Sequence, residues 1–271
     1  MRHRAALFAA VLVAGVACST FEAAPEPVEA GAGQDASASD SAGAPSDAGA
    51  TCPSGRGPAM VLVDIGPTKR FCVDSTEVTR AQYTAFLDDA PPIASQASIC
   101  AWNKTFTSGI NADFTNGPLP AVGIDWCDAL AFCTWAGKRL CGSIADGGAL
   151  PFGATADPGR SEWMVACSRN GNRKFSYGQN EVDGSCNVNG APGPAAVGSY
   201  TACQGGYDGI FDMVGNVDEW ENACDDLGDG GKLCANRGGS FRSTGICYFA
   251  NSAPPSIQSG DWGFRCCADA R

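Results

Sequence analysis

One stretch decides the fold of this chain: Tyr207-Asp208-Gly209-Ile210-Phe211-Asp212-Met213-Val214-Gly215-Asn216-Val217-Asp218-Glu219-Trp220. At its centre, Gly215-Asn216 is a turn dipeptide that lets the backbone reverse sharply. Asp212 and Glu219 stand on either side of the turn, and a hard cation such as Ca²⁺ prefers carboxylate and carbonyl oxygens of this kind. A buried turn in which Asn216 and Glu219 bond loose amides explains the same residues, because the spacing does not match an EF-hand loop.

The same stretch resembles the central signature of the formylglycine-generating enzyme family, also called the sulfatase-modifying-factor domain. Further segments resemble that family in the expected order, from about residue 58 to 268: Asp74-Ser75-Thr76-Glu77-Val78-Thr79, Pro120-Ala121-Val122-Gly123-Ile124-Asp125-Trp126, Trp135-x-Gly137-Lys138-Arg139-Leu140, Glu162-Trp163, Arg237-Gly238-Gly239-Ser240-Phe241 and Gly263-Phe264-Arg265-Cys266. The resemblance implies an α+β fold of the C-type-lectin-like kind, rich in loops and poor in regular secondary structure. It also implies that Asp212 and Glu219 would offer carboxylates to calcium, with main-chain carbonyls from Gly215 and Val217.

The copper site of the family is incomplete in this chain. In the family's copper-dependent oxidases, two cysteines shortly after the Arg-Gly-Gly-Ser-aromatic motif hold Cu(I), which prefers soft thiolates. Here Ser243 stands where the first thiolate would be, and Cys247 remains alone. We therefore do not expect copper, although Ser243 and Cys247 are the candidate catalytic residues if oxidation persists. An ordinary disulfide explains Cys247 equally well.

Residues around this motif are candidates for ligand binding. Its two glycines allow close backbone approach to a ligand. If a cleft exists there, we expect it to be lined by Ser240, Arg242, Ser243, Cys247 and Tyr248, with Trp262 as a wall.

The first 17 residues read as an export signal. A basic head at residues 1–4 precedes an apolar run at 5–17, which is too short to span a bilayer. Cys18 follows small residues, as at a bacterial lipoprotein cleavage site, so we expect it to be lipidated; plain signal cleavage nearby is the alternative. A diacylated cysteine would tether the protein to a membrane without inserting it. These features predict an exported cell-envelope lipoprotein, in the periplasm or on the cell surface.

Residues 18–51 have the composition of a tether. Between residues 19 and 51 the chain is built of Ala, Ser, Gly and Pro with six acids, and such a segment cannot bury enough apolar surface to offset its chain entropy. The domain proper then spans residues 52–271. Removing the two arginines of the head and the six acids of the tether from the formal charge of −11 leaves −7 for this domain. We therefore expect no basic surface for nucleic acid.

Cysteine and histidine counts limit the chemistry. Of 15 cysteines, 14 remain when Cys18 is set aside, which allows up to seven disulfides in an oxidising compartment. We expect the adjacent Cys266 and Cys267 to bond to different partners. The one histidine, His3, lies in the signal, so nucleophile systems based on imidazole and His-ligated zinc or iron are excluded from the domain.

Local patterns predict few regular elements: strands at 60–65 and 70–74, and helices at 79–88, 125–137 and 162–168. Thr79 with Gln82 makes a capping box, Asp125 with Asp128 begins the second helix, and Gly137 ends it. Residues 141–161 extend the family pattern by a Gly-rich loop, which we expect a disulfide at Cys141 to anchor. Surface decoration is the default interpretation of this loop, with a functional role as the alternative. Residues 169–206 are expected to be irregular.

Two classes of function follow. The first is a binding module stabilised by calcium, whose partner is an extracellular peptide, a glycan or a small ligand. The second is an enzyme, either a divergent formylglycine-generating-type oxidase or a periplasmic tailoring enzyme. A purely structural role leaves the Arg-Gly-Gly-Ser-Phe segment unexplained. The missing copper cysteine favours the binding module.

Overall fold

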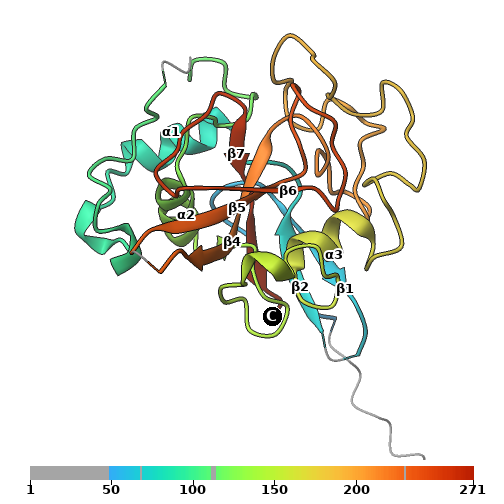
Figure 1. Ribbon diagram of the computed structural model, residues 1–271, viewed down its shortest axis with the longest axis horizontal. Coiled ribbons are helices and arrows are strands. Elements are labelled where there is room, and N and C mark those ends of the chain that lie inside the picture. Colours follow the sequence, from blue (N-terminus) through green and yellow to red (C-terminus); the bar gives the residue numbers. More distant parts are fainter. Residues whose placement is uncertain (1–48, 68, 111–113, 229) are drawn as a thin grey trace, which may run out of the picture. The chain divides into compact units, whose positions relative to one another are not determined.

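The computed structural model describes residues 49–67, 69–110, 114–228 and 230–271. Short helices and strands alternate there with long irregular segments, as Figure 1 shows, which confirms the predicted α+β, loop-rich fold. Within the described ranges, no helix has the length and apolar character needed to cross a bilayer. The predicted signal at residues 1–17 and the predicted lipidated Cys18 lie outside the described residues. The predicted tether also lies outside them, except for residues 49–51.

One sheet joins strands from both ends of the domain, in the order β1-β2-β8-β3. β1 (Met60–Asp64) and β2 (Arg70–Asp74) form an antiparallel hairpin, which confirms the two predicted strands. β8 (Cys266–Asp269) pairs antiparallel with β2 on one side and with β3 (Arg139–Leu140) on the other. The last strand of the chain therefore fixes the first hairpin to the middle of the domain.

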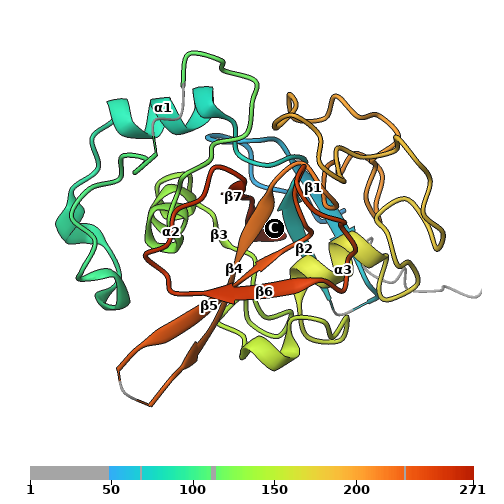
Figure 2. The same cartoon turned by 45° about the horizontal axis from the view of Figure 1, so that its top comes forward.

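The second sheet has the order β6-β5-β4-β7, and the last three residues of the signature stretch begin its strand β4. β4 (Asp218–Asp226) and β5 (Lys232–Arg237) are antiparallel, and β6 (Ala250–Ala253) continues the sheet beside β5. β7 (Trp262–Phe264) runs parallel to the start of β4. In Figure 2 the β4–β5 hairpin extends away from the three helices. This arrangement brings the ends of the Gly-Asn turn motif, the Arg-Gly-Gly-Ser motif and the Gly-Phe-Arg motif together.

In the described ranges, three α-helices form where the sequence predicts them: α1 (Arg80–Asp88), α2 (Trp126–Trp135) and α3 (Glu162–Ser168). Both bonds of the capping box are present, because Gln82 N donates to Thr79 Oγ1 and Thr79 N donates to Gln82 Oε1. Asp125 accepts the N–H of Asp128 at 2.9 Å at the start of α2. Three single-turn 3₁₀ helices complete the set: η1 (Ile93–Ser95), η2 (Ser98–Cys100) and η3 (Phe152–Ala154). Local capping chemistry thus places the helices as the sequence predicted.

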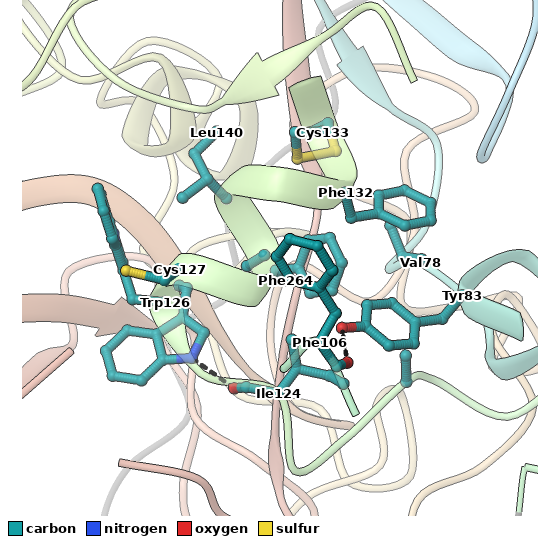
Figure 3. Packing of buried hydrophobic residues seen from close by; sticks show 14 of the residues in the cluster. Val78, Tyr83, Phe106, Ile124, Trp126, Cys127, Phe132, Cys133, Leu140 and Phe264 are labelled. Atoms are coloured by element: carbon teal, nitrogen blue, oxygen red, sulfur yellow. Dashed lines mark hydrogen bonds between the residues drawn. A yellow bond between two sulfur atoms is a disulfide. The ribbon is translucent and has the colours of Figure 1, made fainter. Parts of the chain in front are cut away.

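The core has an aromatic part, which packs α1 and α2 against β7. Figure 3 shows Tyr83, Phe132 and Phe264 in this cluster. The rings of Tyr83 and Phe132 stack with centroids 5.8 Å apart, and Phe132 meets Phe264 edge-on at 5.3 Å. The Tyr83 hydroxyl donates to the Phe106 carbonyl at 2.6 Å, so the polar end of this buried ring is satisfied. A second cluster surrounds α3, which is buried along its whole length.

Seven disulfides cross-link the domain: Cys52–Cys72, Cys100–Cys127, Cys133–Cys266, Cys141–Cys267, Cys167–Cys247, Cys186–Cys203 and Cys224–Cys234. They use all 14 cysteines after Cys18, as the even count predicted. The neighbours Cys266 and Cys267 have different partners, and Cys141 anchors the 141–161 loop; both predictions are confirmed. Disulfides at this density are typical of oxidising compartments.

Candidate functional site

The turn at Gly215-Asn216 is a buried tie between distant segments. Both residues have left-handed backbone conformations, with φ of 80° and 56°. A Cβ at Gly215 would lie 2.6 Å from the carbonyl oxygen of Asn187, so only glycine fits there. The Asn216 side chain donates to Glu77 at 3.0 Å and accepts the N–H of Ala195 at 2.8 Å. These contacts are the ones that the buried-turn interpretation predicts.

Glu219, at the end of the turn motif, forms a buried ion pair with Arg265. Its Oε1 lies 2.6 Å from Arg265 Nη2 and its Oε2 lies 2.7 Å from Arg265 Nε. The Oε2 atom also accepts the indole N–H of Trp163 at 2.7 Å. Arg265 further donates to the carbonyls of Asp74 and Phe211. Burial lowers the pKa of Arg265, but the Glu219 carboxylate outweighs burial and raises that pKa above its ordinary value.

Two further buried acids, Glu77 and Asp212, lie beside the Glu219–Arg265 ion pair. Asp212 Oδ2 accepts the N–H of Gly198 at 2.6 Å, whereas Glu77 Oε2 has no hydrogen-bond partner in the described part of the chain. Burial, and then the charge of Asp212, raises the pKa of Glu77 well above its ordinary value. Burial raises the pKa of Asp212 to about 6. Both carboxyls therefore favour their protonated forms more than free carboxyls do.

The residues predicted to bind calcium do not form a cage for that ion in this arrangement. Calcium takes six to eight oxygen ligands, yet both oxygens of Glu219 are held by Arg265 and Trp163. Among the residues that the structure describes, no group of three or more His, Cys, Asp or Glu side chains is placed to hold a metal ion. Calcium at Asp212, Gly215, Val217 and Glu219 stays a prediction of the sequence, and the function proposed below does not use it.

A second buried ion pair, which sequence patterns missed, joins Arg237 to Glu221. Arg237 Nη1 lies 3.2 Å from Glu221 Oε2, and the guanidinium stacks on the Trp163 ring with its carbon 4.5 Å from the ring centroid. Arg237 Nη2 donates to the carbonyl of Cys247 at 2.5 Å. Period-two alternation along β4 was the available signal, because it places Glu219 and Glu221 on the same face. Arg237, the first residue of the Arg-Gly-Gly-Ser motif, therefore stabilises the buried core.

The predicted catalytic residues are both engaged within the protein. The Ser243 hydroxyl oxygen accepts the N–H of Ser240 at 3.0 Å. Cys247 is fully buried and forms a disulfide with Cys167 of α3, so the disulfide alternative is the one that the structure shows. A hydroxyl and a disulfide do not fit a Cu(I) ion, which needs thiolates.

Two predicted ligand residues, Ser240 and Arg242, contact Asp261. The Ser240 hydroxyl donates to Asp261 Oδ2 at 3.1 Å, and Arg242 Nε lies 3.9 Å from the same oxygen. The Arg242 side chain is 63% exposed, and its guanidinium lies over the Phe241 ring at 5.1 Å. With Ser243 bonded to Ser240, this cluster combines an exposed cation with a partly covered carboxylate.

Tyr248 and Trp262 make their contacts elsewhere. The Tyr248 hydroxyl donates to the carbonyl of Gly171, beyond the end of α3, at 3.1 Å. The Trp262 ring, in β7, meets Trp220 edge-on with centroids 5.1 Å apart. Tyr248 is bound to a loop on the α3 side, and Trp262 packs against a core residue.

Comparison with known proteins identifies the family. Residues 55–270 match the sulfatase-modifying factor enzyme 1-like domain, which is most of the chain. The chain belongs to that family. The signature stretch, the Arg-Gly-Gly-Ser motif and the Gly-Phe-Arg motif, from which the resemblance was inferred, all lie inside the matched region.

Curated relatives and solved structures agree with this assignment. The formylglycine-generating enzyme of Mus musculus is 30% identical over 55% of this chain, and the match covers 44% of that enzyme, so it spans less than half of its length. The formylglycine-generating enzyme of Streptomyces coelicolor is 26% identical over 74% of this chain and 78% of its own length. The structures of CarF and of PvdO from Pseudomonas aeruginosa each superpose with a TM-score of 0.51 at 20% identity. CarF covers 79% and PvdO 82% of this chain, with 96% and 91% of their own chains matched, which shows a shared fold.

Proposed function

We propose that this domain is a ligand- or protein-binding module of the cell envelope that has kept the family fold without copper oxidation. The observation that carries the proposal is the buried Cys167–Cys247 disulfide, which occupies the one cysteine left at the copper position. Ser243, at the other copper position, offers a hydroxyl that is already hydrogen-bonded. Neither group is a soft thiolate ligand. Its partner would be an extracellular peptide, a glycan or a small ligand.

Two further points support a binding role. The family includes a Bos taurus protein named inactive C-alpha-formylglycine-generating enzyme 2, which is 28% identical over 56% of this chain. That name shows that relatives of this domain exist without the activity. In addition, the exposed Arg242 and the Asp261 carboxylate beside it offer opposite charges at the surface, next to Ser240. Such groups contact a partner without needing a reactive centre.

The envelope setting is part of the same proposal. Seven disulfides require an oxidising compartment. The basic head, the short apolar run and Cys18 supply an export signal and a lipid anchor. Metabolic labelling with a palmitate analogue tests the anchor, with label expected on the wild-type chain and absent from Cys18→Ala.

Copper titration tests the central part of the proposal. The purified domain would be titrated anaerobically with Cu(I) held by ascorbate in the presence of a chromogenic Cu(I) chelator. We expect the chelator to keep the copper, because the disulfide-bonded protein presents no pair of thiolates. One equivalent of tightly bound Cu(I) that is lost in Cys247→Ala would contradict the proposal and favour a formylglycine-generating-type oxidase or a periplasmic tailoring enzyme.

A further inference from the structure

A hollow of about 300 Å³ lies beside the Arg-Gly-Gly-Ser segment and has no part in the site described above. Its chemistry is set by two tyrosines, two acids and two small apolar side chains: Tyr177, Tyr200, Glu181, Asp183, Val182 and Val188. The hollow forms in the irregular region between α3 and β4. Ligand sites are concave, largely apolar regions with a few polar groups, and this hollow has that composition.

Backbone hydrogen bonds attach one wall of the hollow to the predicted ligand segment. The N–H of Asn189 donates to the carbonyl of Ser243 at 3.2 Å, and the N–H of Ala191 donates to the carbonyl of Phe241 at 2.9 Å. Asn189 and Ala191 both line the hollow. These bonds hold that wall against the backbone on both sides of Arg242.

The floor of the hollow is held in place before any ligand binds. Cys186, which lines it, is cross-linked to Cys203, close in sequence to Tyr200. Asn187, also in the lining, is buried and donates to the Asn216 side chain at 3.0 Å, which connects the floor to the signature turn. A pre-formed site loses less conformational entropy on binding than a flexible one.

The charges around the hollow are negative, and its two tyrosines are half-buried, with the Tyr177 ring stacked on Phe175. Glu181 and Asp183 are exposed at the rim, and no lysine or arginine belongs to the lining. Burial, and then the charges of Glu181 and Asp183, raises the pKa of Tyr177. An aromatic face attracts a cation, and nearby carboxylates add to that attraction. The net charge of −7 on the domain also disfavours an anion here.

We propose that this hollow binds an alkylammonium group, such as the lysine side chain of a partner peptide. The ammonium would lie between the tyrosine rings and the two carboxylates, while the alkyl stem would contact Val182 and Val188. The inference rests on the proposed binding function and names the chemistry of its ligand. It adds a subsite to the Arg242 cluster.

Binding of a lysine probe to the full chain tests the inference. Nα-acetyl-lysine methylamide would be titrated into the protein and followed by NMR, beside Nα-acetyl-norleucine methylamide, a neutral analogue that lacks the ammonium group. We expect the lysine probe to bind more tightly and to weaken as salt is added. In the variant Glu181→Gln/Asp183→Asn its affinity should fall about five- to tenfold. The matched variant Asp88→Asn/Asp208→Asn removes two exposed carboxylates outside the hollow and should leave the affinity unchanged.

Several results would overturn the inference. Equal binding of the norleucine probe, equal loss in both double variants, or no saturable shift with the lysine probe would each do so. Ca²⁺ binding that depends on Glu181 and Asp183, without lysine binding, would instead assign the hollow to a metal. Tyr200→Leu provides an independent check, since it should weaken the lysine probe without changing the charge. The copper titration is separate from all of these, so failure of the inference is distinguishable from failure of the proposed function.

Discussion

The buried ion pairs and the surface segment at residues 240–248 use the family motifs in opposite ways. In the interior, Glu219–Arg265 and Glu221–Arg237 are almost completely removed from water, and each of these four charges has a partner of opposite sign. At the surface, the Arg242 side chain is exposed to solvent. The charges of the interior pairs are therefore neutralised within the protein, whereas the charge of Arg242 is exposed to a binding partner.

The difference separates motif residues that stabilise the fold from motif residues that are exposed for binding. Removing one member of a buried pair leaves an uncompensated charge in the interior, which is strongly destabilising. A change at an exposed residue has little effect on stability but alters what the surface binds. The two predicted copper positions differ in this respect: Ser243 is half-buried beside Arg242, whereas Cys247 is fully buried in a disulfide that belongs to the frame.

The largest expected effect comes from breaking the Glu219–Arg265 pair. Arg265→Met should lower the free energy of unfolding by about 3–5 kcal/mol, because Glu219 remains buried and unpaired. Urea denaturation followed by tryptophan fluorescence measures this. Arg242→Ala serves as the control and should change stability by less than about 0.5 kcal/mol. Similar losses of unfolding free energy in Arg265→Met and Arg242→Ala would contradict the distinction between the buried ion pairs and the surface segment.

Removing the Cys167–Cys247 disulfide should have the next largest effect. The double variant Cys167→Ala/Cys247→Ala frees a cross-link between positions 80 residues apart. We expect a loss of about 2–4 kcal/mol, mainly because the unfolded chain gains freedom. Denaturation under non-reducing conditions, with the other six disulfides intact, gives the value. An unchanged midpoint would mean that this bond contributes nothing to the frame.

The buried acids Asp125 and Asp128 differ from the two ion pairs, because their hydrogen-bond partners are neutral amides and not arginines. We therefore expect this acid pair to make the stability of the protein depend on pH. Burial, and then the charge of Asp125, raises the pKa of Asp128 to about 8, and burial raises the pKa of Asp125 to about 6. Asp128 and Asp125 bond to the amides of Asn103 and Gln258. Because folding favours the protonated acids, their stabilisation is present below about pH 4 and is lost as the pH rises to about 8.

Asp128→Asn tests this assignment. The wild-type free energy of unfolding should fall by about 1–3 kcal/mol between pH 5 and pH 8, and the variant should show a flatter profile. Urea titrations at pH 5, 6.5 and 8 provide the measurement. Wild-type stability that rises over this range, or an equally steep variant, would show that Asp128 is ionised in the folded protein.

The smallest effect is expected from calcium. Since Arg265 already neutralises Glu219, adding Ca²⁺ or a chelator should shift the melting temperature by no more than about 1 °C. Differential scanning calorimetry in chelator and in millimolar Ca²⁺ measures the shift. Strong stabilisation by Ca²⁺ that disappears in Asp212→Asn would establish the calcium site that the sequence predicts and would show that the Glu219–Arg265 pair opens to admit the ion.

Sequence patterns predicted what depends on neighbours in the chain. Caps such as Thr79 with Gln82 act within one turn of helix, so the helices begin where expected. Family motifs supplied the fold, and the even cysteine count supplied the number of disulfides. The pairing of Cys167 with Cys247 and of Glu219 with Arg265 was not predictable, because these contacts join residues that are 80 and 46 positions apart.

The candidate site was predicted only in part. Ser240, Arg242 and Ser243 are close because they share one tight segment. Tyr248 and Trp262 diverge because the Cys247 disulfide and the strand β7 direct them to different partners. The hollow between Tyr177 and Tyr200 was missed, since irregular loops have no periodicity from which a shared cavity can be inferred.

Disulfide mapping tests the central claim most directly. The mature protein, purified from an oxidising compartment, would be alkylated without reduction, digested and analysed by mass spectrometry. We expect a peptide pair joined through Cys167 and Cys247, with neither cysteine alkylated. Recovery of Cys247 as an alkylated free thiol would contradict the account and make an oxidative metal site the better explanation.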